Sequence, residues 1–458
     1  METRNEKRET KKRVTEITII GAGLVGSLLS IYLVKRGYKV KIYERRSDMR
    51  TEKVVAGRSI NLALSDRGIK ALEEIGIMED VKKIAIPMHG RFMHNLNGSY
   101  TQQAYGIEGQ FINSVSRGEL NKKLITLAEE NGVEIFFNEK CENIDWKKNE
   151  IKFLNGANLQ LSTFNFQLLF GSDGAFSASR LTNQLQSDRF EYSQHYIEAG
   201  YKELTIPAGE NGTYQIEKNA LHIWPRGNYM LIALPNMDGS FTCTLFFPFE
   251  GEPSFKSLDT KEKVTTFFKE KFADIVPLIP TLEEDFFNNP TSSLVTVKCF
   301  PWVREDKFAL IGDAAHAIVP FFGQGMNCGF EDCLVLNNLI DKHNENWELI
   351  LQEYQQLRKP DADAIAQLAL NNFKEMSDKA GDAKFLLQKK IETNFSKKYP
   401  AKWIPAYSQV TFSPHIRYSD ALKNSIRQEE IMQQVMSIEN IEELWDSKIV
   451  EEKMLAFL

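Results

Sequence analysis

Three glycines near the N-terminus have a spacing that can cradle a phosphate. They follow the pattern G-x-G-x-x-G and are Gly21, Gly23 and Gly26. In such a pattern the first glycine turns the chain, the second lets a pyrophosphate approach the backbone, and the third lets a helix touch a strand. The free N–H groups and the positive dipole end of the helix would then face the phosphate. Because the pattern alone is a weak signal, the flanking segments must decide what it means.

These flanking segments have the order of a β-α-β unit. Residues 14–20 are β-branched and predict a strand, residues 27–36 carry apolar side chains at helical spacing, and residues 39–44 alternate as a second strand. That strand ends in Glu44, about twenty residues beyond the glycines, where a carboxylate can accept hydrogen bonds from a ribose hydroxyl pair. A strand, a helix and a distal acid in this register predict that the unit binds a dinucleotide.

A signal peptide or a membrane anchor is the alternative for the same stretch. Residues 17–34 carry no charge and follow the basic residues 11–13. The stretch lacks a small-residue cleavage site, however, and a charged strand follows it too soon. Its apolar character is better explained by a strand that is buried on both faces of a sheet.

Two later segments are expected to contact the same dinucleotide. An apolar strand near residue 168 ends in Asp173, and another near residue 308 ends in Gly312-Asp313 before a glycine-containing loop and a helix that starts near Met326. Carboxylates at strand ends can hold sugar-like hydroxyls, and a loop before a helix offers free N–H donors. An ordinary nicotinamide dehydrogenase needs no such return. A flavin dinucleotide is longer, and its ring takes negative charge on reduction, which suits a helix N-terminus.

The composition is that of an ordinary globular protein. The 458 residues are 42% hydrophobic and 26% charged, which predicts two or three domains. A net charge of −6, from 56 basic and 62 acidic residues, argues against a dedicated nucleic-acid binder. The five cysteines lack zinc-ligand spacing, so we expect no metal site and free thiols in a reducing cytoplasm. Residues 1–13 are nearly all polar and predict a disordered tail.

Together, the glycines with Glu44, the Asp173 motif and the Gly312-Asp313 motif resemble the single-component FAD-dependent aromatic hydroxylases of the p-hydroxybenzoate hydroxylase type. Longer strings narrow the resemblance to the kynurenine hydroxylases within that family. These strings lie at residues 57–68 (GRSINLALSDRG), 112–124 (INSVSRGELNKKL), 221–250 and 312–333 (GDAAHAIVPFFGQGMNCGFEDC). They are more specific than the glycine pattern, and the resemblance extends over most of the chain.

The resemblance implies a set of cofactor-binding residues. The first β-α-β unit would hold the FAD, the segment after residue 57 would pass along it, and Met326 and Asn327 would lie beside the flavin ring. With Asp173, the set comprises Gly21, Gly23, Gly26, Glu44, Arg46, Arg58, Leu64, Arg117, Asp173, Asp313, Met326 and Asn327.

The resemblance also implies a kynurenine-binding set of Arg91, Tyr105, Asn372 and Tyr407. An arginine can grip the α-carboxylate of kynurenine bidentately, and tyrosine hydroxyls can donate to the same group. Phe321 is expected to pack against the aromatic ring of the substrate. Without the family context, a surface ion pair for Arg91 and a core position for Tyr407 stay open.

The activity that the resemblance implies is hydroxylation of L-kynurenine to 3-hydroxykynurenine with NADPH and O2 through a flavin C4a-hydroperoxide. This reaction belongs to tryptophan degradation and to the formation of NAD through quinolinate. No nucleophile–base pair is expected, because the cofactor does the chemistry. The alternatives are a hydroxylase of another anionic aromatic such as a hydroxybenzoate or anthranilate, and a flavin-binding scaffold without turnover. A flavin-dependent halogenase is disfavoured, because residues 401–405 (AKWIP) match only part of the W-x-W-x-I-P motif.

The predicted fold class is α/β. A Rossmann-like FAD-binding domain would be discontinuous, formed by residues 14–85, 110–185 and 300–345, with an inserted β-sheet substrate domain and a helical region. The substrate domain would comprise residues 86–109 and 186–299, and the helical region residues 346–458. Residues 421–458 contain no apolar run long enough to span a membrane, so we expect a soluble cytoplasmic enzyme. The sequence leaves open a homodimer and the preference between NADPH and NADH.

Overall fold

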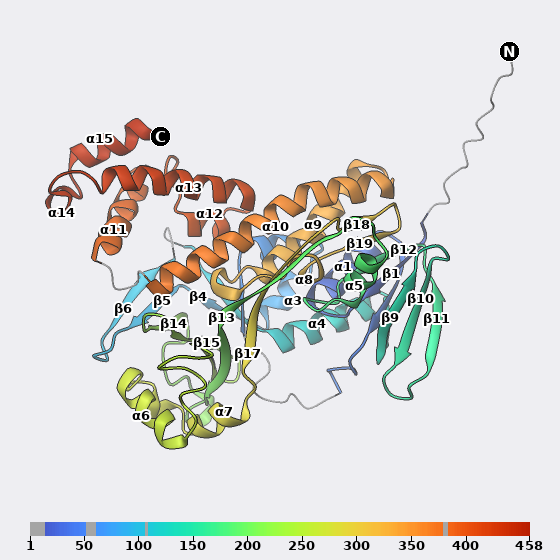
Figure 1. Cartoon of the computed structure of the whole chain (residues 1–458), viewed down its shortest axis with the longest axis horizontal. Coiled ribbons are helices and arrows are strands. Elements are labelled where there is room, and N and C mark those ends of the chain that lie inside the picture. Colours follow the sequence, from blue (N-terminus) through green and yellow to red (C-terminus); the bar gives the residue numbers. More distant parts are fainter. Residues whose placement is uncertain (1–13, 52–60, 106–108, 379–382) are drawn as a thin grey trace, which may run out of the picture.

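The N-terminal β-α-β unit forms the middle of a parallel sheet (Figure 1). In the computed structural model, which describes residues 14–51, 61–105, 109–378 and 383–458, the strand order is β18-β19-β12-β1-β2-β8. All pairings are parallel except that of β18 with β19. The strands are β1 (Glu16–Ile20), β2 (Lys39–Glu44), β8 (Glu134–Phe137), β12 (Leu168–Gly171), β18 (Val303–Arg304) and β19 (Phe308–Leu310). The side chains of β12 and β19 are all buried, as expected for strands covered on both faces.

The predicted boundaries of this unit shift by a few residues. Helix α1 (Leu24–Lys35) begins directly after Gly23, three residues earlier than the apolar periodicity indicates, and β1 begins at Glu16. Gly26 belongs to the first turn of this helix, where the missing side chain lets the turn lie against the backbone of Gly21, directly after β1.

Further elements cover the parallel sheet on its two sides. Helix α1 packs against α4 (Arg117–Glu130) and α9 (Gly325–Lys342). A small antiparallel sheet, β11-β10-β9, packs its apolar side chains on β2, where the rings of Tyr43 and Phe153 stack with centroids 4.3 Å apart. Its strands are β9 (Glu139–Asp145), β10 (Glu150–Asn155) and β11 (Leu161–Asn165), and α5 (Ala178–Leu185) lies against β9.

A second, largely antiparallel sheet follows the order β17-β13-β16-β15-β14-β5-β6, with one parallel pairing between β14 and β5. The two strands predicted on either side of the turn at residues 236–240 are its neighbours β15 and β16. We call this the large sheet. Its strands are β5 (Gly90–His94), β6 (Tyr100–Ala104), β13 (Glu191–Ile206), β14 (Ala220–Pro225), β15 (Met230–Pro235), β16 (Phe241–Pro248) and β17 (Ser292–Phe300). Helices α6 (Lys261–Lys271) and α7 (Leu282–Asn288) cover its outer face (Figure 1).

The two sheets are joined by a short sheet of order β3-β7-β4. Its strands are β3 (Asn61–Leu64), β4 (Ala85–Met88) and β7 (Ile112–Ser116), and the helices α2 (Asp66–Glu74) and α3 (Met78–Lys82) lie between β3 and β4 in the chain. Since β4 pairs with β7 and β5 pairs with β14, the chain passes to the large sheet between residues 88 and 90.

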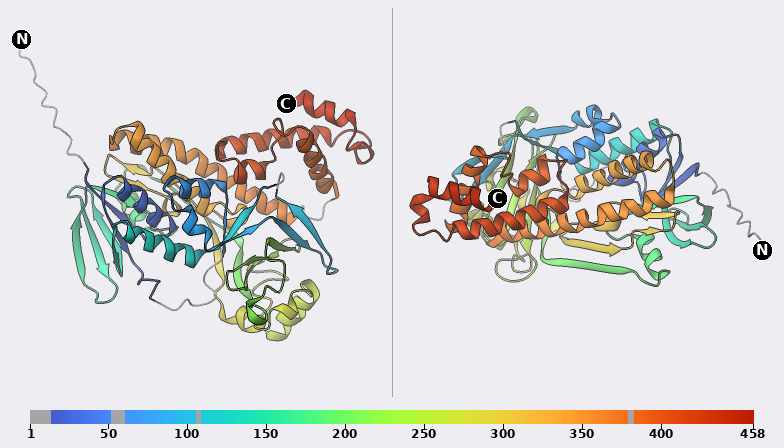
Figure 2. Two further views of the ribbon diagram at one scale, coloured as in Figure 1. Left: turned by 180° about the vertical axis from the view of Figure 1, so that it is seen from behind. Right: turned by 90° about the horizontal axis from the view of Figure 1, so that it is seen from above.

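The described chain after residue 346 is mostly helical, as predicted. Helix α10 is 32 residues long and crosses the molecule, while the helices that follow it gather at the end opposite to β9–β11 (Figures 1 and 2). The helices are α10 (Trp347–Asp378), α11 (Ala383–Lys398), α12 (Ala406–Phe412), α13 (Tyr418–Val435), α14 (Ile441–Leu444) and α15 (Lys448–Phe457). Within the described ranges, none of the helices combines the length and the apolarity that a bilayer crossing requires. The tail predicted for residues 1–13 lies outside those ranges.

Candidate active site

One large cavity of about 1630 Å³ lies among the parallel sheet, the large sheet and the C-terminal helices. Segments that are far apart in the sequence form its wall. The predicted site residues that line it are Gly23, Arg46, Arg91, Arg117, Asp313, Phe321, Met326, Asn372 and Tyr407. A single space of this size, bordered by a glycine loop and by a cluster of aromatic and basic side chains, can hold an extended dinucleotide together with a small aromatic molecule.

The three glycines differ in what surrounds them. Gly21 has a φ of +102°, a backbone conformation that favours glycine. A Cβ atom on Gly26 would lie 2.1 Å from the carbonyl oxygen of Gly21, so the third glycine allows helix and strand to touch. A Cβ atom on Gly23 would meet nothing within 4 Å, and Gly23 borders the cavity at the start of α1. The open position therefore lies where a pyrophosphate would approach the helix N-terminus.

Glu44 is buried at the end of β2 and is already hydrogen-bonded within the protein. Its carboxylate accepts hydrogen bonds from the backbone N–H of Ala22 at 2.8 Å and from Nε of Arg46 at 2.8 Å. Burial would raise the pKa of the Glu44 carboxyl, but these hydrogen bonds and the charge of Arg46 hold it below its ordinary value. Glu44 thus stays ionised and braces the glycine loop, while Arg46 is the member of the pair that lines the cavity.

A second helix N-terminus borders the same cavity. Helix α9 starts at Gly325 without a side-chain cap, and both Gly325 and Met326 line the cavity. Asp313, which starts the short helix α8 (Asp313–His316), also lines it. Two helix N-termini and one carboxylate around one space fit the phosphates, the ribityl hydroxyls and the electron-rich ring of a flavin dinucleotide.

Beyond the glycine loop and Glu44, three predicted cofactor residues do not line the cavity. The carboxylate of Asp173 accepts hydrogen bonds from Ser177 and Ser179 and so fixes the start of α5. The amide of Asn327 is fully buried and ties α9 to the backbone of β3, with its Oδ1 accepting from Ser65 N–H at 3.0 Å. Leu64 is fully buried and does not line the cavity. Arg58 lies outside the described residues.

Three predicted substrate residues come together at the large sheet, and two of them, Arg91 and Tyr407, line the cavity, whereas Tyr105 does not. The guanidinium carbon of Arg91 lies 4.8 Å from the ring centre of Tyr105 and 4.2 Å from that of Tyr407. Among the described residues Arg91 forms no salt bridge, so its charge is available to a ligand. The hydroxyl of Tyr105 is buried and lacks a hydrogen-bond partner within the same set of residues. Burial raises the pKa of the Tyr105 hydroxyl, which therefore stays protonated and can donate.

Aromatic side chains close the space beside this cluster. Phe321 belongs to the turn Pro320–Phe322, and its ring lies 5.1 Å from that of Phe246 and 4.4 Å from that of Phe373. Nδ2 of Asn372, on α10, donates to the carbonyl oxygen of Phe321 at 2.6 Å. Asn372 thus lines the cavity and also holds the aromatic turn against α10.

The sequence analysis predicted the large sheet but named none of its apolar residues that form the floor of the cavity. Alternate residues of three neighbouring strands in the large sheet point into the space, and these are Leu221, Ile223, Met230, Ile232, Leu234, Thr244 and Phe246. The alternation along each strand could have identified them, because every second side chain faces one side of a sheet. Asn121 on α4 was also missed. Its Nδ2 donates to the carbonyl oxygen of Ala22, and its buried Oδ1 has no partner within the described part of the chain.

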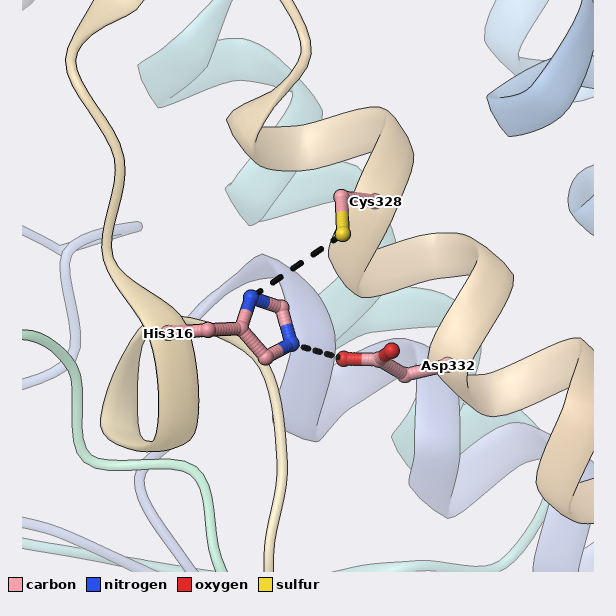
Figure 3. A group of neighbouring side chains, drawn as sticks. All are labelled: His316, Cys328 and Asp332. Carbon is pink, nitrogen blue, oxygen red and sulfur yellow. Dashed lines mark hydrogen bonds and ion pairs between the residues drawn. The ribbon is translucent and has the colours of Figure 1, made fainter. Parts of the chain in front are cut away.

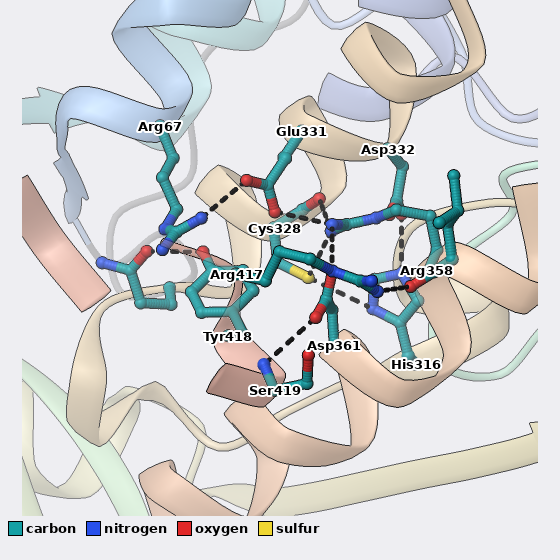
Figure 4. A network of polar contacts seen from close by, with 12 residues as sticks. Arg67, His316, Cys328, Glu331, Asp332, Arg358, Asp361, Arg417, Tyr418 and Ser419 are labelled. Atoms are coloured by element: carbon teal, nitrogen blue, oxygen red, sulfur yellow. Dashed lines mark hydrogen bonds and ion pairs between the residues drawn. The ribbon is translucent and has the colours of Figure 1, made fainter. Parts of the chain in front are cut away.

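A buried ion-pair network connects this site to the C-terminal helices. His316 extends from α8 toward Asp332 on α9, and its Nε2 lies 2.6 Å from an Asp332 carboxylate oxygen, with Cys328 nearby (Figure 3). Arg358 on α10 lies against Asp332, Glu331 and Cys328 (Figure 4). The ligand atoms of His316, Cys328 and Asp332 are within 4.8 Å of one another. The positively charged guanidinium of Arg358, however, already contacts both Asp332 and the sulfur of Cys328, where a metal cation would have to bind. We therefore interpret the cluster as a structural network.

Asp332 links this network to the cavity. Besides His316 and Arg358, its carboxylate accepts a hydrogen bond from the N–H of Gly312, the residue before Asp313. Burial would lower the pKa of His316, but the charge of Asp332 raises it well above the ordinary value. The network extends further through Arg67, which contacts Glu331 and the backbone around α12.

The fold and this cavity define a flavin-dinucleotide-binding protein. The family described as "FAD binding domain" matches residues 14–369, so the chain belongs to that family. Among solved structures, the tetrameric form of 2-methyl-3-hydroxypyridine-5-carboxylic acid oxygenase aligns with a TM-score of 0.68 at 19% identity, covering 89% of this chain and 98% of the other. That likeness concerns the fold, and it confirms the predicted fold class.

Closer relatives define a narrower group. A kynurenine 3-monooxygenase of Flavobacterium psychrophilum is 53% identical over 443 residues, which cover 97% of this chain and 98% of that protein. One of Dictyostelium discoideum is 46% identical over 434 residues, which cover 92% and 93% of the two chains. The chain belongs to the kynurenine 3-monooxygenase family, and the resemblance noted in the sequence is confirmed.

Proposed function

We propose that the protein is an FAD-dependent monooxygenase that converts L-kynurenine to 3-hydroxykynurenine with NADPH and O2. The observation that carries the proposal is the position of Arg91. Its guanidinium is held between two tyrosine rings and without an acidic partner among the described residues, in the wall of the cavity that begins at the glycine loop. A free arginine in that place suits an aromatic substrate that bears a carboxylate.

The proposed substrate contacts follow from this arrangement. Arg91 would bind the α-carboxylate with two N–H groups, and the hydroxyls of Tyr105 and Tyr407 would donate to the same oxygens. Burying the Tyr105 hydroxyl without a partner costs free energy in the free protein, so a ligand oxygen that accepts from it contributes to binding. The aniline ring would then lie toward Phe321 and the apolar floor of the large sheet.

The proposed cofactor contacts use backbone more than side chains. The N-terminus of α1 at Gly23 would hold the pyrophosphate of FAD, and Arg46 and Arg117 would neutralise charge along the same wall. The N-terminus of α9 at Met326 would stabilise negative charge on the flavin ring. When bound, the flavin supplies the activation of O2, a reaction that no amino-acid side chain performs.

The chain itself must orient the substrate and exclude water. The aromatic turn at Phe321 and Phe322 and the side chain of Met230 give the cavity an apolar wall next to Arg91. An apolar wall would keep water from the flavin, and a fixed carboxylate would hold the aromatic ring of the substrate in one orientation toward it. Loose substrate binding would instead release hydrogen peroxide.

The proposal is tested with purified holoenzyme, NADPH and a panel of aromatic acids. L-kynurenine is expected to accelerate flavin reduction and to yield 3-hydroxykynurenine with one NADPH consumed per product. Hydroxybenzoate and anthranilate lack the amino-acid side chain that the Arg91 cluster would bind, and they are expected to have little effect. Acceleration by either compound but not by kynurenine would overturn the substrate assignment, and absence of NADPH oxidation with every compound would indicate a scaffold.

Location and domain division are also proposed. All five cysteines are free and buried, which supports a reducing compartment such as the cytoplasm. After β4 the chain passes from the short sheet to the large sheet, which supports a boundary between the FAD-binding and substrate domains near residue 86. Limited proteolysis of the holoenzyme would test this boundary. Gel filtration with light scattering would test the homodimer.

A further inference from the structure

A buried arginine outside the cavity binds the end of the helix that carries Tyr407. Arg67 lies near the start of α2, is 1% exposed and does not line the cavity. Its Nε donates to the carbonyl oxygen of Val410 at 2.8 Å, and its Nη2 donates to that of Gln409 at 3.3 Å. Both carbonyls belong to α12, in which Val410 follows Tyr407 by about one turn. The proposed function uses Tyr407 but assigns no role to Arg67.

These contacts satisfy backbone groups that α12 cannot satisfy by itself. The last four carbonyl oxygens of a helix have no partner within it, and in α12 those of Gln409 and Val410 are among them. The same guanidinium donates to the carbonyl oxygens of Ser413 and Ile416, in the segment after the helix. A helix of only 7 residues is marginal by itself, so contacts with the rest of the protein must hold it. Arg67 therefore acts as a C-terminal cap that a different helix supplies.

Arg67 is itself fixed by a charged partner and by an aromatic ring. Its Nη1 donates to Oε1 of Glu331 on α9 at 2.7 Å, and the two side chains point toward each other (Figure 4). Its guanidinium carbon lies 4.0 Å from the centre of the Tyr418 ring, at the start of α13. The hydroxyl of Tyr418 donates at 2.8 Å to Oε1 of Gln324, the residue before α9. A carboxylate at one end and a ring against its face hold the guanidinium in one orientation.

The start of α2 is joined closely to α9, whose N-terminus borders the cavity. The N–H of Ser65 donates to Oδ1 of Asn327 at 3.0 Å, and a Cβ atom on Gly68 would lie 2.4 Å from the same oxygen. Arg67 lies between these two contacts in the sequence. A cap on α12 that is anchored here relates the position of Tyr407 to the helix end that is proposed to face the flavin.

We propose that Arg67 is a positioning residue for substrate binding: by capping α12 from α2, it holds Tyr407 against Arg91 before the substrate arrives. This inference rests on the proposed function of Tyr407. The ring of Tyr407 lies 4.2 Å from the guanidinium carbon of Arg91 and stacks on Phe322 with centroids 5.6 Å apart. A tyrosine that is already in place binds the substrate carboxylate without the cost of ordering its helix at that moment.

Replacing Arg67 by methionine tests the idea without touching the cavity. Methionine is unbranched and flexible, so it fills much of the space but donates no hydrogen bond. Glu331 stays paired with Arg358 in this variant, so the loss concerns mainly the cap of α12. We expect the KM for kynurenine to rise about tenfold, the effect of losing one hydrogen bond to a charged group, while kcat and FAD content stay at the parent values. Arg67→Lys keeps a charge and part of the donors, and it should lie between the parent and Arg67→Met.

The matched control alters the same network but not the cap. Glu331→Gln removes the charge that faces Arg67 and leaves the donors to the α12 carbonyls in place. This variant should lower the thermal stability, because Arg67 and Arg358 both lose a buried partner, and it should leave the KM for kynurenine unchanged. A rise in KM of the same size in Glu331→Gln and Arg67→Met would overturn the proposal, because it would indicate mere loosening of the fold.

A double variant shows whether Arg67 acts through Tyr407. Tyr407→Phe alone should raise the KM about tenfold, because it removes the hydroxyl that donates to the carboxylate. If Arg67 acts by positioning that hydroxyl, adding Arg67→Met to Tyr407→Phe should leave the KM within about twofold of the Tyr407→Phe value. A further tenfold rise in the double variant, or an unchanged KM in Arg67→Met, would overturn the proposal.

Hydrogen exchange of the unmodified holoenzyme gives a readout that needs neither turnover nor a folded variant. The amides of α12 should be protected before kynurenine is added, because the cap lies within the protein. Protection that appears only with kynurenine would overturn the proposal, since the substrate and not Arg67 would then order the helix. A parent enzyme that ignores kynurenine would refute the proposed function, while hydrogen exchange would still decide whether α12 is held in advance.

Discussion

Replacing Arg91 by alanine separates a ligand-binding role from a structural one. In the free protein the guanidinium contacts the rings of Tyr105 and Tyr407 and forms no salt bridge within the described residues. Two cation–π contacts contribute about 1–2 kcal/mol to stability, so the variant should fold and keep its FAD. In the complex, the variant loses a bidentate, charge-assisted pair worth roughly 3–4 kcal/mol, which corresponds to a 100- to 1000-fold weaker Kd for kynurenine.

The assay is a titration of holoenzyme with kynurenine, followed by the change in flavin absorbance, together with steady-state NADPH oxidation. Arg91→Lys keeps the charge but not the planar fork, and it should lie between the parent and Arg91→Ala, weakened about tenfold. Arg189, an exposed arginine, provides a control that should bind kynurenine like the parent when it is replaced by alanine. Unchanged binding by Arg91→Ala would refute the assigned contact, and loss of FAD from it would show that Arg91 supports the fold.

Three further predictions concern the cofactor end and the buried network. Gly26→Ala should be unstable and should fail to bind FAD, because its Cβ would lie 2.1 Å from the carbonyl oxygen of Gly21. Gly23→Ala should fold normally, because its Cβ meets nothing within 4 Å, but it should weaken FAD binding. Thermal unfolding and FAD titration check both variants. The pKa of the Glu44 carboxyl is lowered in the folded protein, so the stability that Glu44 gives the glycine loop is present at neutral pH and is lost as the pH falls through that lowered pKa. Acidification should therefore release FAD, which flavin fluorescence would report. In Glu44→Gln this release should depend less on pH. Asp332→Asn removes the buried negative charge that pairs with both Arg358 and His316, and it should lower the free energy of unfolding by about 3–5 kcal/mol, as measured by denaturant titration.

Each of these predictions has a matched control. Gly156→Ala places its Cβ 3.8 Å from the nearest oxygen and should be neutral. Glu142→Gln alters an exposed glutamate that pairs with Lys140, and Asp341→Asn breaks an exposed pair with Arg36 that is worth about 1 kcal/mol or less. Parent-like behaviour of Gly26→Ala, an acid-release curve of Glu44→Gln that matches the parent, or a loss in Asp332→Asn no larger than in Asp341→Asn would contradict the respective argument.

The sequence by itself determined the elements that rest on local patterns. The β-α-β unit around the glycines was predictable because period-2 and period-3.6 spacing reflect which faces a strand or helix can bury. The strands on either side of the turn at residues 236–240 and the long helix from residue 347 were predictable for the same reason. Longer strings identified the family, and with it a set of residues for each end of the cavity.

Only the tertiary structure decided which of those residues face a common space. Arg91 and Tyr407 are more than 300 positions apart in the chain and meet because β5 lies at one wall of the cavity and α12 at another. Asp173 and Asn327 match family motifs, yet their hydrogen bonds are satisfied within the protein. Each polar group takes the partner that packing places nearest, and that choice is not encoded in local spacing.

His94, His222 and Asp274 illustrate the same limit: the ring of His94 lies within hydrogen-bond distance of both His222 and Asp274. No motif joins these residues, and the parallel pairing of β5 with β14 brings the two histidines together. Burial lowers the pKa of His222 to about 4, and that burial exists only in the folded chain. Local sequence thus sets where strands and helices form, while the electrostatic state of a side chain is set by neighbours that only the complete fold assembles.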